Sequence, residues 1–169
     1  MPPALGAAAA FGISYRSATD EDLPFLARLY ASTRAEELAL TGWPAEAQAR
    51  FLAQQFDAQH RHYQAHYPAA EWLMIELRDE AVGRLYLEEQ RDEFRIIDIA
   101  LLAAVRGRGY GRAILTDILD EAGRAQKGVS LHVEKNNRAV CLYRRLGFIR
   151  IGEHGVYDLM ERKSAASEG

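Results

Sequence analysis

Three glycines alternate with larger residues in the run RGRGYG at residues 106–111. An apolar, strand-like segment precedes this glycine loop, and an amphipathic helical pattern follows it. Glycine lets a backbone turn tightly and approach a ligand closely. The first N–H groups of a helix have no partner inside the helix and lie at the positive end of its dipole, an arrangement that binds phosphate oxygens. Arg106, Arg108 and Arg112 add positive charge, so the loop predicts a site for a phosphorylated cofactor.

A dinucleotide-binding fold is the alternative interpretation of the glycine loop. That fold favours the spacing G-x-G-x-x-G after an early strand, with an acidic residue about 20 residues further on. Here the spacing is G-x-G-x-G, the loop lies in the middle of the chain, and Gln126 and Lys127 stand where the acid would be. The pattern therefore disfavours this alternative.

A second candidate motif follows the next strand-like segment, where residues 136–148 read NNRAVCLYRRLGF. Asn136 and Tyr143 are seven residues apart, which is almost two turns, or about 10 Å, along a helix. We therefore expect them on one face of a short helix over residues 137–146. Asn136 also suits a helix N-cap, a role for which Asn137 competes. From spacing alone, Tyr143 suits an anchor of the helix in the core equally well.

Hydrophobic periodicity and turn residues predict the elements that must position these motifs. The expected order is strand, two helices, three strands, helix, strand, helix and two strands. Thr19, followed by acidic residues, begins the first helix, and residues 42–44 separate it from the second. The expected strands cover residues 13–16, 71–77, 81–88, 94–102, 129–134, 148–152 and 156–160.

Taken together, the two motifs resemble those of the GNAT superfamily of acyl-CoA-dependent N-acetyltransferases. Residues 106–111 match that family's pattern of Gln or Arg, two residues, Gly, one residue, and Gly or Ala. Residues 136–148 match its Asn…Ala…Leu-Tyr…Leu-Gly-Phe segment, and the likeness extends over residues 13–160. The resemblance implies an α/β (α+β) fold, in which a mixed, twisted sheet of about seven strands is flanked by four helices. The fourth and fifth strands of such a sheet splay apart.

The resemblance also implies where a cofactor lies. The pantetheine arm of acetyl-CoA would pair with strand backbone in the gap between the splayed strands, and the pyrophosphate would sit on N–H groups of the glycine loop. Asn136 matches the position whose side chain contacts the pantetheine or the thioester. The implied cofactor-binding residues are Ile99, Ala100, Leu101, Arg106, Gly107, Arg108, Gly109, Tyr110, Gly111, Arg112 and Asn136.

Acetyl transfer to an amine defines three chemical roles. The attacking amine must be neutral, although a lysine titrates near about 10.4 and an α-amine near about 7.7. The oxyanion needs a donor already aimed at it, and the resemblance implies the backbone N–H of Leu101. Tyr143 matches the tyrosine that protonates the departing thiolate.

The general base is the open assignment. Some family members carry a glutamate on the fifth strand, but Leu131 stands at the aligned position. Glu88, Asp98 and His132 are the candidate side chains, and a water chain to solvent would serve as well. Glu88 also suits a solvated strand end, and Asp98 a salt bridge with a nearby arginine.

Histidines and aromatic residues gather in the second expected helix, where residues 59–67 read QHRHYQAHY. His62 and His66 are four residues apart, as two metal ligands on one helix would be. No Cys and no H-E-x-x-H pattern completes a site, so we expect no metal and a partly exposed helix face. In the alternative interpretation, this segment lines the acceptor pocket together with Trp43, Tyr63 and Tyr67.

We predict an acetyl-CoA-dependent N-acetyltransferase that transfers an acetyl group to a primary amine of a small molecule or protein. Direct attack in a ternary complex is expected, because Cys141 lies in mid-helix and suits packing better than an acyl-enzyme. The alternative is a non-catalytic domain that binds acyl-CoA as a sensor or interaction module. The acceptor and the preferred acyl chain stay open.

Composition indicates a soluble, cytoplasmic chain. Apolar residues make up 49% and charged residues 27%, as in ordinary globular domains, and the net charge of −3 gives no basic field for nucleic acid. No stretch approaches the roughly 20 apolar residues that span a bilayer, and a single cysteine favours a reducing compartment. We expect one domain over residues 1–169, with loose tails at 1–11 and 163–169 around an acyltransferase domain at 13–162. The resemblance also implies a possible homodimer through the last hairpin.

Overall fold

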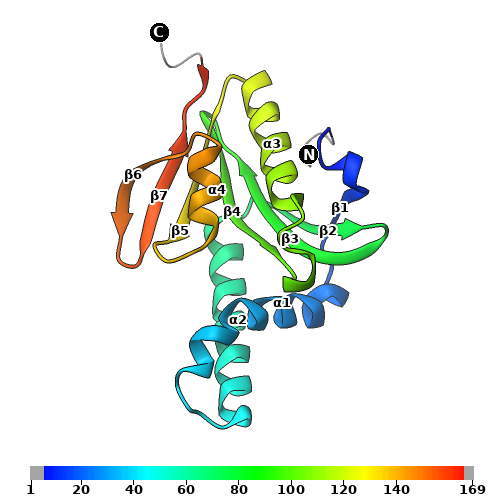
Figure 1. Cartoon of the computed structure of the whole chain (residues 1–169), viewed down its shortest axis with the longest axis vertical. Coiled ribbons are helices and arrows are strands. Elements are labelled where there is room, and N and C mark those ends of the chain that lie inside the picture. The colour runs from blue at the N-terminus through cyan, green and yellow to red at the C-terminus, as the bar shows by residue number, and fades with distance from the viewer. Residues whose placement is uncertain (1–5, 166–169) are drawn as a thin grey trace.

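The computed structural model describes residues 6–165, in which seven strands form one mixed sheet with helices on both faces (Figure 1). The strand order is β1-β2-β3-β4-β5-β7-β6. The strands are β1 (Ile13–Ser17), β2 (Glu71–Leu77), β3 (Glu80–Glu89), β4 (Glu93–Leu101), β5 (Gly128–Glu134), β6 (Ile149–His154) and β7 (Tyr157–Arg162). The helices are α1 (Leu23–Ala39), α2 (Ala45–His66), α3 (Tyr110–Arg124) and α4 (Ala139–Arg145), with 3-10 turns η1 (Ala9–Phe11), η2 (Asp20–Asp22) and η3 (Ala103–Val105). The expected fold class and element order are confirmed.

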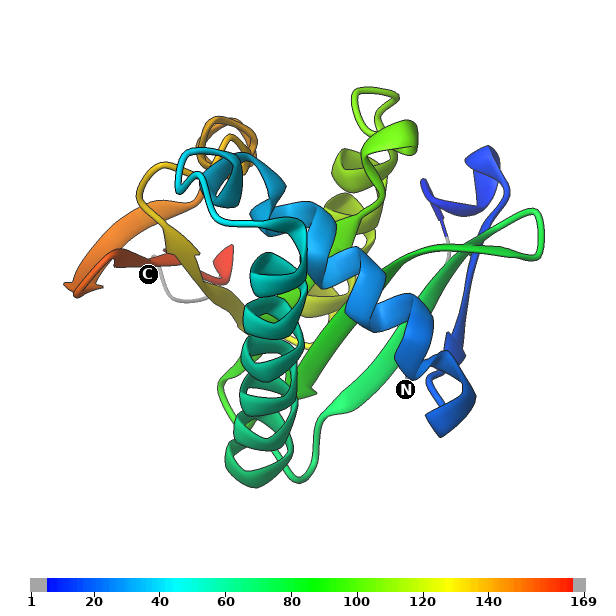
Figure 2. The same cartoon turned by 90° about the horizontal axis from the view of Figure 1, so that it is seen from below.

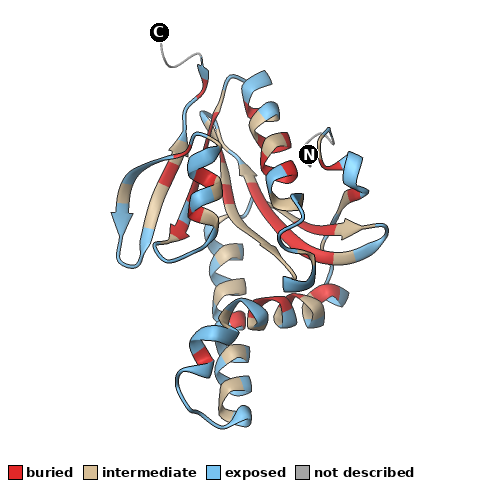
Figure 3. Cartoon of the chain, in the orientation of Figure 1, coloured by how far each residue is buried: buried red, intermediate tan, exposed pale blue. Residues whose placement is uncertain are grey.

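The two faces of the sheet bury separate hydrophobic clusters. α3 and α4 cover the larger cluster, to which α3 contributes Ile114, Leu115 and Ile118. On the opposite face, α1 and α2 cross the sheet (Figure 2) and bury a smaller cluster around Tyr30 and Phe56. Figure 3 shows buried residues gathered where the helices meet the central strands. Within residues 6–165, no helix is long and apolar enough to cross a membrane.

β4 and β5 run parallel but pair over only four residues of each strand, Glu93–Ile96 with Gly128–Leu131. Directly after this pairing, the register of β4 with β3 shifts, which leaves Ile97 as the extra residue of a β-bulge. A bulge bends and twists its strand. β4 and β5 therefore diverge. Residues 97–101 of β4 and 132–134 of β5 do not pair with each other, and we call these two segments the fork. The predicted splay of the fourth and fifth strands is confirmed.

The backbone of β4 presents alternate residues to the fork. The N–H of Leu102 donates to the carbonyl of Val82 on β3, and Leu101 stands opposite Gly83 in the register. In an antiparallel pair, backbone groups point alternately toward and away from the partner strand. The groups of Ala100 therefore face β3, whereas those of Ile99 and Leu101 face the fork.

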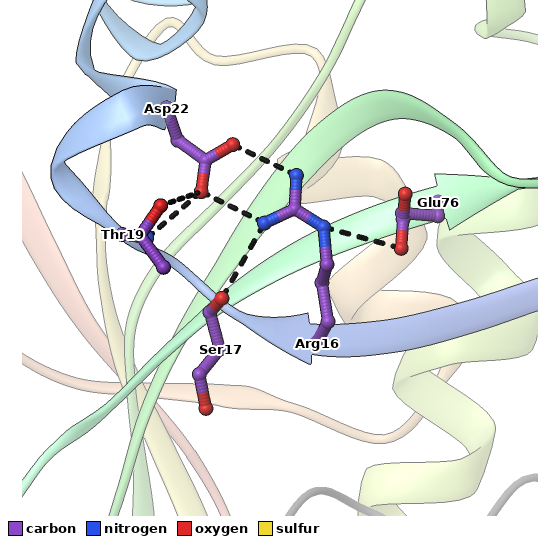
Figure 4. A network of polar contacts seen from close by, with 5 residues as sticks. All are labelled: Arg16, Ser17, Thr19, Asp22 and Glu76. Carbon is purple, nitrogen blue, oxygen red and sulfur yellow. Dashed lines mark hydrogen bonds and ion pairs between the residues drawn. The ribbon is translucent and has the colours of Figure 1, made fainter.

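An ion pair ties the start of α1 to the sheet. The carboxylate of Asp22 accepts two hydrogen bonds of 2.8 Å from the guanidinium of Arg16 on β1 and one of 2.8 Å from the N–H of Thr19 (Figure 4). Arg16 also lies 3.3 Å from Glu76 on β2. The hydrogen bond from Arg16 is the largest cause that lowers the pKa of Asp22 to about 2. The capping role expected for Thr19 is confirmed, since Thr19 and Asp22 form a capping box.

The chain ends differ from the expected loose tails. The N–H groups of Ala7 and Ala8 donate to the carboxylate of Asp117 on α3, at 2.7 and 2.9 Å. Residues 6–11 are therefore packed, while residues 1–5 lie outside the described part of the chain. Ser164 is buried, and residues 166–169 are also outside it. The extent of the acyltransferase domain, residues 13–162, stays a prediction.

The close approach of β3 and β4 makes Gly83 intolerant of a side chain. A Cβ atom there would lie 2.3 Å from the carbonyl oxygen of Ala100 and 2.8 Å from Cδ2 of Leu101. We expect Gly83→Ala to lower the free energy of unfolding by about 1–3 kcal/mol. Gly152→Ala on β6 is the control, because a Cβ atom there meets nothing within 4 Å, and its effect should stay within about 0.5 kcal/mol. Denaturant unfolding compares the two variants, and equal stabilities would contradict the close approach.

Candidate active site

The glycine loop connects the end of β4, through η3, to the start of α3. Gly107 and Gly109 have φ angles of 75° and 86°, in the left-handed region that glycine adopts without strain. Gly109 is the N-cap of α3, so N–H groups of the first turn lack acceptors within the helix. A Cβ atom on Gly107 would meet nothing within 4 Å. The loop therefore has both the backbone geometry and the room of a phosphate-binding turn.

The three arginines of the loop have two different surroundings. The Nε–H of Arg106 donates to the carbonyl oxygen of Leu101 at 3.0 Å, so its guanidinium is tied to the end of β4. Arg108 and Arg112 are exposed beside the loop. Because the carbonyl of Leu101 already accepts a hydrogen bond from Arg106, the N–H is the backbone group of Leu101 that stays available in the fork.

The loop, the end of β4 and α4 meet at one place. A Cβ atom on Gly111, in the first turn of α3, would lie 4.0 Å from Cδ1 of Leu101 and 4.0 Å from Cδ2 of Leu142 on α4. These two motifs, far apart in the sequence, are thus brought together against the fork.

Tyr143 of α4 is only 5% exposed. Its ring packs edge-on against Phe148, with ring centroids 5.7 Å apart. Burial raises the pKa of Tyr143 above its usual value, and the nearby charge of Asp98 on β4 adds to the rise. The phenol therefore keeps its proton at neutral pH and above.

The two asparagines before α4 do different things. The Oδ1 of Asn137 accepts the N–H of Ala139, the first residue of α4, at 2.8 Å, although Arg138 occupies the N-cap position. Asn136 is exposed and lines a cavity. Because α4 begins only at Ala139, Asn136 lies before the helix, and the prediction that it shares a helical face with Tyr143 is wrong.

Two of the three candidate bases are poorly placed. Glu88 stands opposite Arg95, six positions along β4 from Leu101, which is about 20 Å along a strand. Glu88 is therefore not brought to the fork. His132 lies just beyond the last β4–β5 pair, but its Nδ1 is 3.2 Å from Nη1 of Arg95. Because arginine only donates, this contact assigns the ring proton to Nε2 and leaves His132 no free lone pair. Burial and then Arg95 lower the pKa of His132, which keeps the ring neutral.

Asp98, the third candidate, belongs to a buried ion pair. Nη2 of Arg84 on β3 donates to its carboxylate and, at 3.0 Å, to Oε1 of Gln59 on α2. Arg84 is 3% exposed, and its guanidinium lies over the ring of Tyr86, 5.0 Å from the centroid. Tyr63 of α2 packs edge-on against the same ring at 6.0 Å. Asp98 therefore forms a salt bridge with an arginine, which is the alternative to a general base that the sequence analysis names.

Sequence analysis does not single out Arg84 or Gln59. The signal that points to Arg84 is its position inside the apolar run AVGRLYL at residues 81–87. A charged residue in such a run is buried, and a buried charge requires a partner. The partner itself, Asp98, could not be chosen without the β3–β4 register.

A cavity of about 540 Å³ lies beside the end of β5. Its lining comes from Arg34 and Glu37 of α1, residues 134–136 at the end of β5, and residues 155–157 at the β6–β7 turn. Arg34 lies 2.7 Å from Glu134, so the charges at this part of the wall are paired. The cavity therefore borders the β5 side of the fork through Glu134, and α1 and the β6–β7 turn complete its wall.

The aromatic wall proposed for α2 is not assembled. Trp43 packs against Phe51 near the start of α2, with centroids 5.4 Å apart, whereas Tyr63 lies about 18 Å further along the helix. His62 and His66 are exposed and stack on each other at 4.0 Å. Among the described residues, no group of three or more His, Cys, Asp or Glu side chains is placed to hold a metal ion.

The Arg84–Asp98 pair predicts an asymmetric response to substitution. Asp98→Ala leaves a buried guanidinium without its counter-charge, and should lower the free energy of unfolding by about 3–5 kcal/mol. The double variant Arg84→Met/Asp98→Leu removes both charges and should recover most of that loss. Arg150→Ala, which breaks an exposed contact with Glu153 on β6, is the control and should change stability little. If Asp98→Ala unfolds at the same denaturant concentration as the parent chain, the pair does not stabilise the fold.

Comparison with known sequences agrees with the two motifs. The Acetyltransferase (GNAT) family matches residues 32–148. The peptidyl-lysine N-acetyltransferase YjaB of Escherichia coli K12 is 33% identical over 88 residues, which make up 52% of this chain and 55% of that protein. An uncharacterized protein of Mycobacterium leprae is 44% identical over 61 residues, 36% of this chain and 16% of that protein. The chain thus spans about half, or less, of the length of these curated relatives.

Solved structures share the fold at low sequence identity. PaiA N-acetyltransferase from Thermoplasma acidophilum in complex with coenzyme A matches with a TM-score of 0.67 at 15% identity, over 89% of this chain and 98% of that one. Arabidopsis thaliana Naa50, bound to the bisubstrate analogue CoA-Ac-MVNAL, matches with a TM-score of 0.57 at 19% identity, over 90% and 99%. These likenesses concern the fold, whereas the family match covers more than half of the sequence. The chain belongs to the GNAT family of acetyltransferases.

Proposed function

We propose that this chain transfers an acetyl group from acetyl-CoA to a primary amine. One observation carries the proposal: the backbone of Ile99 and Leu101 faces the fork without a β5 partner, and β4 then leads through η3 into the glycine loop. A strand edge of this kind pairs with the amide groups of an extended ligand. Acetyl-CoA has such an amide-bearing arm attached to a pyrophosphate. A dinucleotide has the pyrophosphate but lacks the arm.

The loop residues support the phosphate end of this cosubstrate. N–H groups between Gly107 and Arg112 precede or begin α3, where the helix dipole favours an anion. Arg108 and Arg112 add exposed cationic side chains beside the turn. The empty space at the Gly107 Cβ position leaves room for phosphate oxygens. Asn136, at the cavity wall, is proposed to contact the thioester end of the arm.

In the proposed reaction, the neutral amine attacks the thioester carbon directly within a ternary complex. The N–H of Leu101 donates a hydrogen bond to the carbonyl oxygen as negative charge builds up there. The C–S bond then breaks, and the Tyr143 hydroxyl protonates the sulfur. The proton that the nitrogen loses on forming the amide restores the phenol.

The raised pKa of Tyr143 is compatible with this role. Burial disfavours the phenolate, and the same surroundings disfavour a thiolate that departs into them. The proton therefore passes between two groups that both resist carrying charge. The phenol is also fully protonated over the neutral pH range, so it is ready to donate.

The initial deprotonation of the ammonium group is assigned to solvent. Glu88 on β3 stands opposite the far end of β4, the lone pair of His132 is engaged by Arg95, and Asp98 is bound to Arg84. The cavity of about 540 Å³ beside the end of β5 is the proposed exit for the proton. A lysine ammonium of a polypeptide is the proposed acceptor, because the relative YjaB is a peptidyl-lysine N-acetyltransferase.

Substitution of Tyr143 by Phe tests the proposed function. Tyr143→Phe removes the hydroxyl but keeps the ring that packs on Phe148, so kcat should fall by about 100-fold or more while KM for acetyl-CoA changes little. Release of CoA thiol with lysine-containing peptides, together with mass spectrometry of the acetylated peptide, measures turnover.

Tyr15→Phe on β1 is the matched control for this test. The Tyr15 hydroxyl is also buried, and it has no hydrogen-bond partner among the described residues. Its removal should leave kcat unchanged. Turnover by Tyr143→Phe at the parent rate would remove Tyr143 from the mechanism. Tight binding of acetyl-CoA without transfer to any lysine peptide or small amine would instead favour a non-catalytic acyl-CoA-binding module.

A further inference from the structure

A buried carboxylate holds the N-terminal segment along α3. Asp117, in the middle of α3, is 2% exposed, and its two oxygens accept the N–H groups of Ala7 and Ala8 at 2.7 and 2.9 Å. Ala8 is fully buried. The segment therefore has a specific anchor on the helix, and residues 6–11 form a strap beside α3 (Figure 1).

The far end of the strap reaches the glycine loop. Phe11 is 42% exposed, yet its ring packs edge-on against Tyr110, the first residue of α3, with centroids 5.4 Å apart. The Cζ of Phe11 also lies 3.7 Å from the position of a Cβ atom on Gly109. Gly12 then turns the chain away into β1 with a φ of 81°. Phe11 is thus the strap residue that touches the N-cap and first residue of the helix.

Contact at this point has a specific physical consequence. Gly109 has no side chain of its own to fix its left-handed conformation, and glycine populates several backbone conformations with similar ease. The N–H groups that follow Gly109 converge on an anion only while that conformation is kept. A neighbouring ring that packs on Gly109 and Tyr110 restricts the alternatives before any ligand arrives.

We propose that the strap is part of the cofactor site, with Phe11 as a positioning residue that preorganises the glycine loop for the pyrophosphate of CoA. Asp117 is the anchor that keeps Phe11 in place. This inference rests on the proposed function, because it takes CoA as the ligand of the loop. According to this inference, the strap raises the affinity for the cofactor and does not affect the rate of the chemical step.

The size of the effect follows from the population of the competent loop. Apparent affinity falls in proportion to the fraction of molecules whose loop is in the binding conformation. If loss of the Phe11 ring lowers that fraction to about one tenth, the Kd for CoA rises about tenfold. The rate at saturating acetyl-CoA stays unchanged, since the Phe11 ring packs at Gly109 and Tyr110 of the glycine loop.

Calorimetric titration with CoA tests this inference on the full chain. We expect Phe11→Ala to raise Kd about tenfold, and Phe11→Tyr, which keeps the ring, to restore the parent value. Phe51→Ala is the matched control, because Phe51 is 37% exposed and packs edge-on against Trp43 at the same centroid distance of 5.4 Å, but at the start of α2. Its Kd should equal that of the parent chain.

A second readout separates positioning from general stability. Phe11→Ala should raise KM for acetyl-CoA with kcat at saturation unchanged, whereas S-acetylpantetheine, which lacks the pyrophosphate, should give the same kcat/KM as with the parent chain. Equal Kd values for Phe11→Ala and Phe51→Ala would overturn the inference, as would a loss of kcat/KM that is the same for both thioesters. If the parent chain does not bind CoA, the proposed function fails. If the parent chain binds CoA and the Phe11→Ala variant binds it equally well, only the inference about the strap fails.

Discussion

The parallel ladder between β4 and β5 stops after four residue pairs, and the rest of the site depends on that interruption. Buried or half-buried backbone groups normally find partners, because an unpaired one loses its hydrogen bond to water without replacement. β5 keeps its other neighbour, β7, along its whole length, and β4 keeps β3. The polar groups between the diverging strands are therefore the ones left to a ligand. In the proposed function, the extended, amide-bearing arm of acetyl-CoA pairs with these groups as a strand would.

Several contacts hold this interruption open at defined positions. The bulge at Ile97 redirects β4. Asp98, the residue after the bulge, is bound by Arg84 from the neighbouring strand β3. Gly83 lets the two strands approach closely near the tip of β4. Arg106 then takes up the carbonyl of Leu101. Each contact acts on the geometry of β4, and so on the direction of the Leu101 N–H.

Local patterns in the sequence were sufficient for the order of the helices and strands and for the glycine loop. Alternating apolar residues located the strands, and Thr19 located the start of the first helical segment. The glycines at 107 and 109 predicted a tight turn, and they have positive φ angles in the structure. The resemblance of two motifs supplied the splay, which no local pattern encodes. The start of α4 was placed two residues too early, because both adjacent asparagines suit an N-cap, whereas the helix begins only at Ala139 with Arg138 at the N-cap position.

Residues that act through long-range contacts could not be predicted in the same way. The Asp117 carboxylate binds backbone groups that are more than a hundred positions away in the sequence, so residues 6–11 look like a tail until α3 is placed beside them. Glu88 was a reasonable candidate base by residue type, but its position depends on the β3–β4 register. The separation of Trp43 from Tyr63 likewise depends on the unbroken length of α2.

Amide hydrogen exchange with and without acetyl-CoA tests the central claim most directly, because it reads the fork backbone residue by residue. Binding in the fork should slow exchange at the N–H groups of Ile99 and Leu101 and in residues 107–112, which face the proposed ligand. The N–H of Ala100, which faces β3, should change little and serves as an internal reference. Protection that falls outside the fork and the glycine loop, or none at saturating acetyl-CoA, would contradict the assignment of this site.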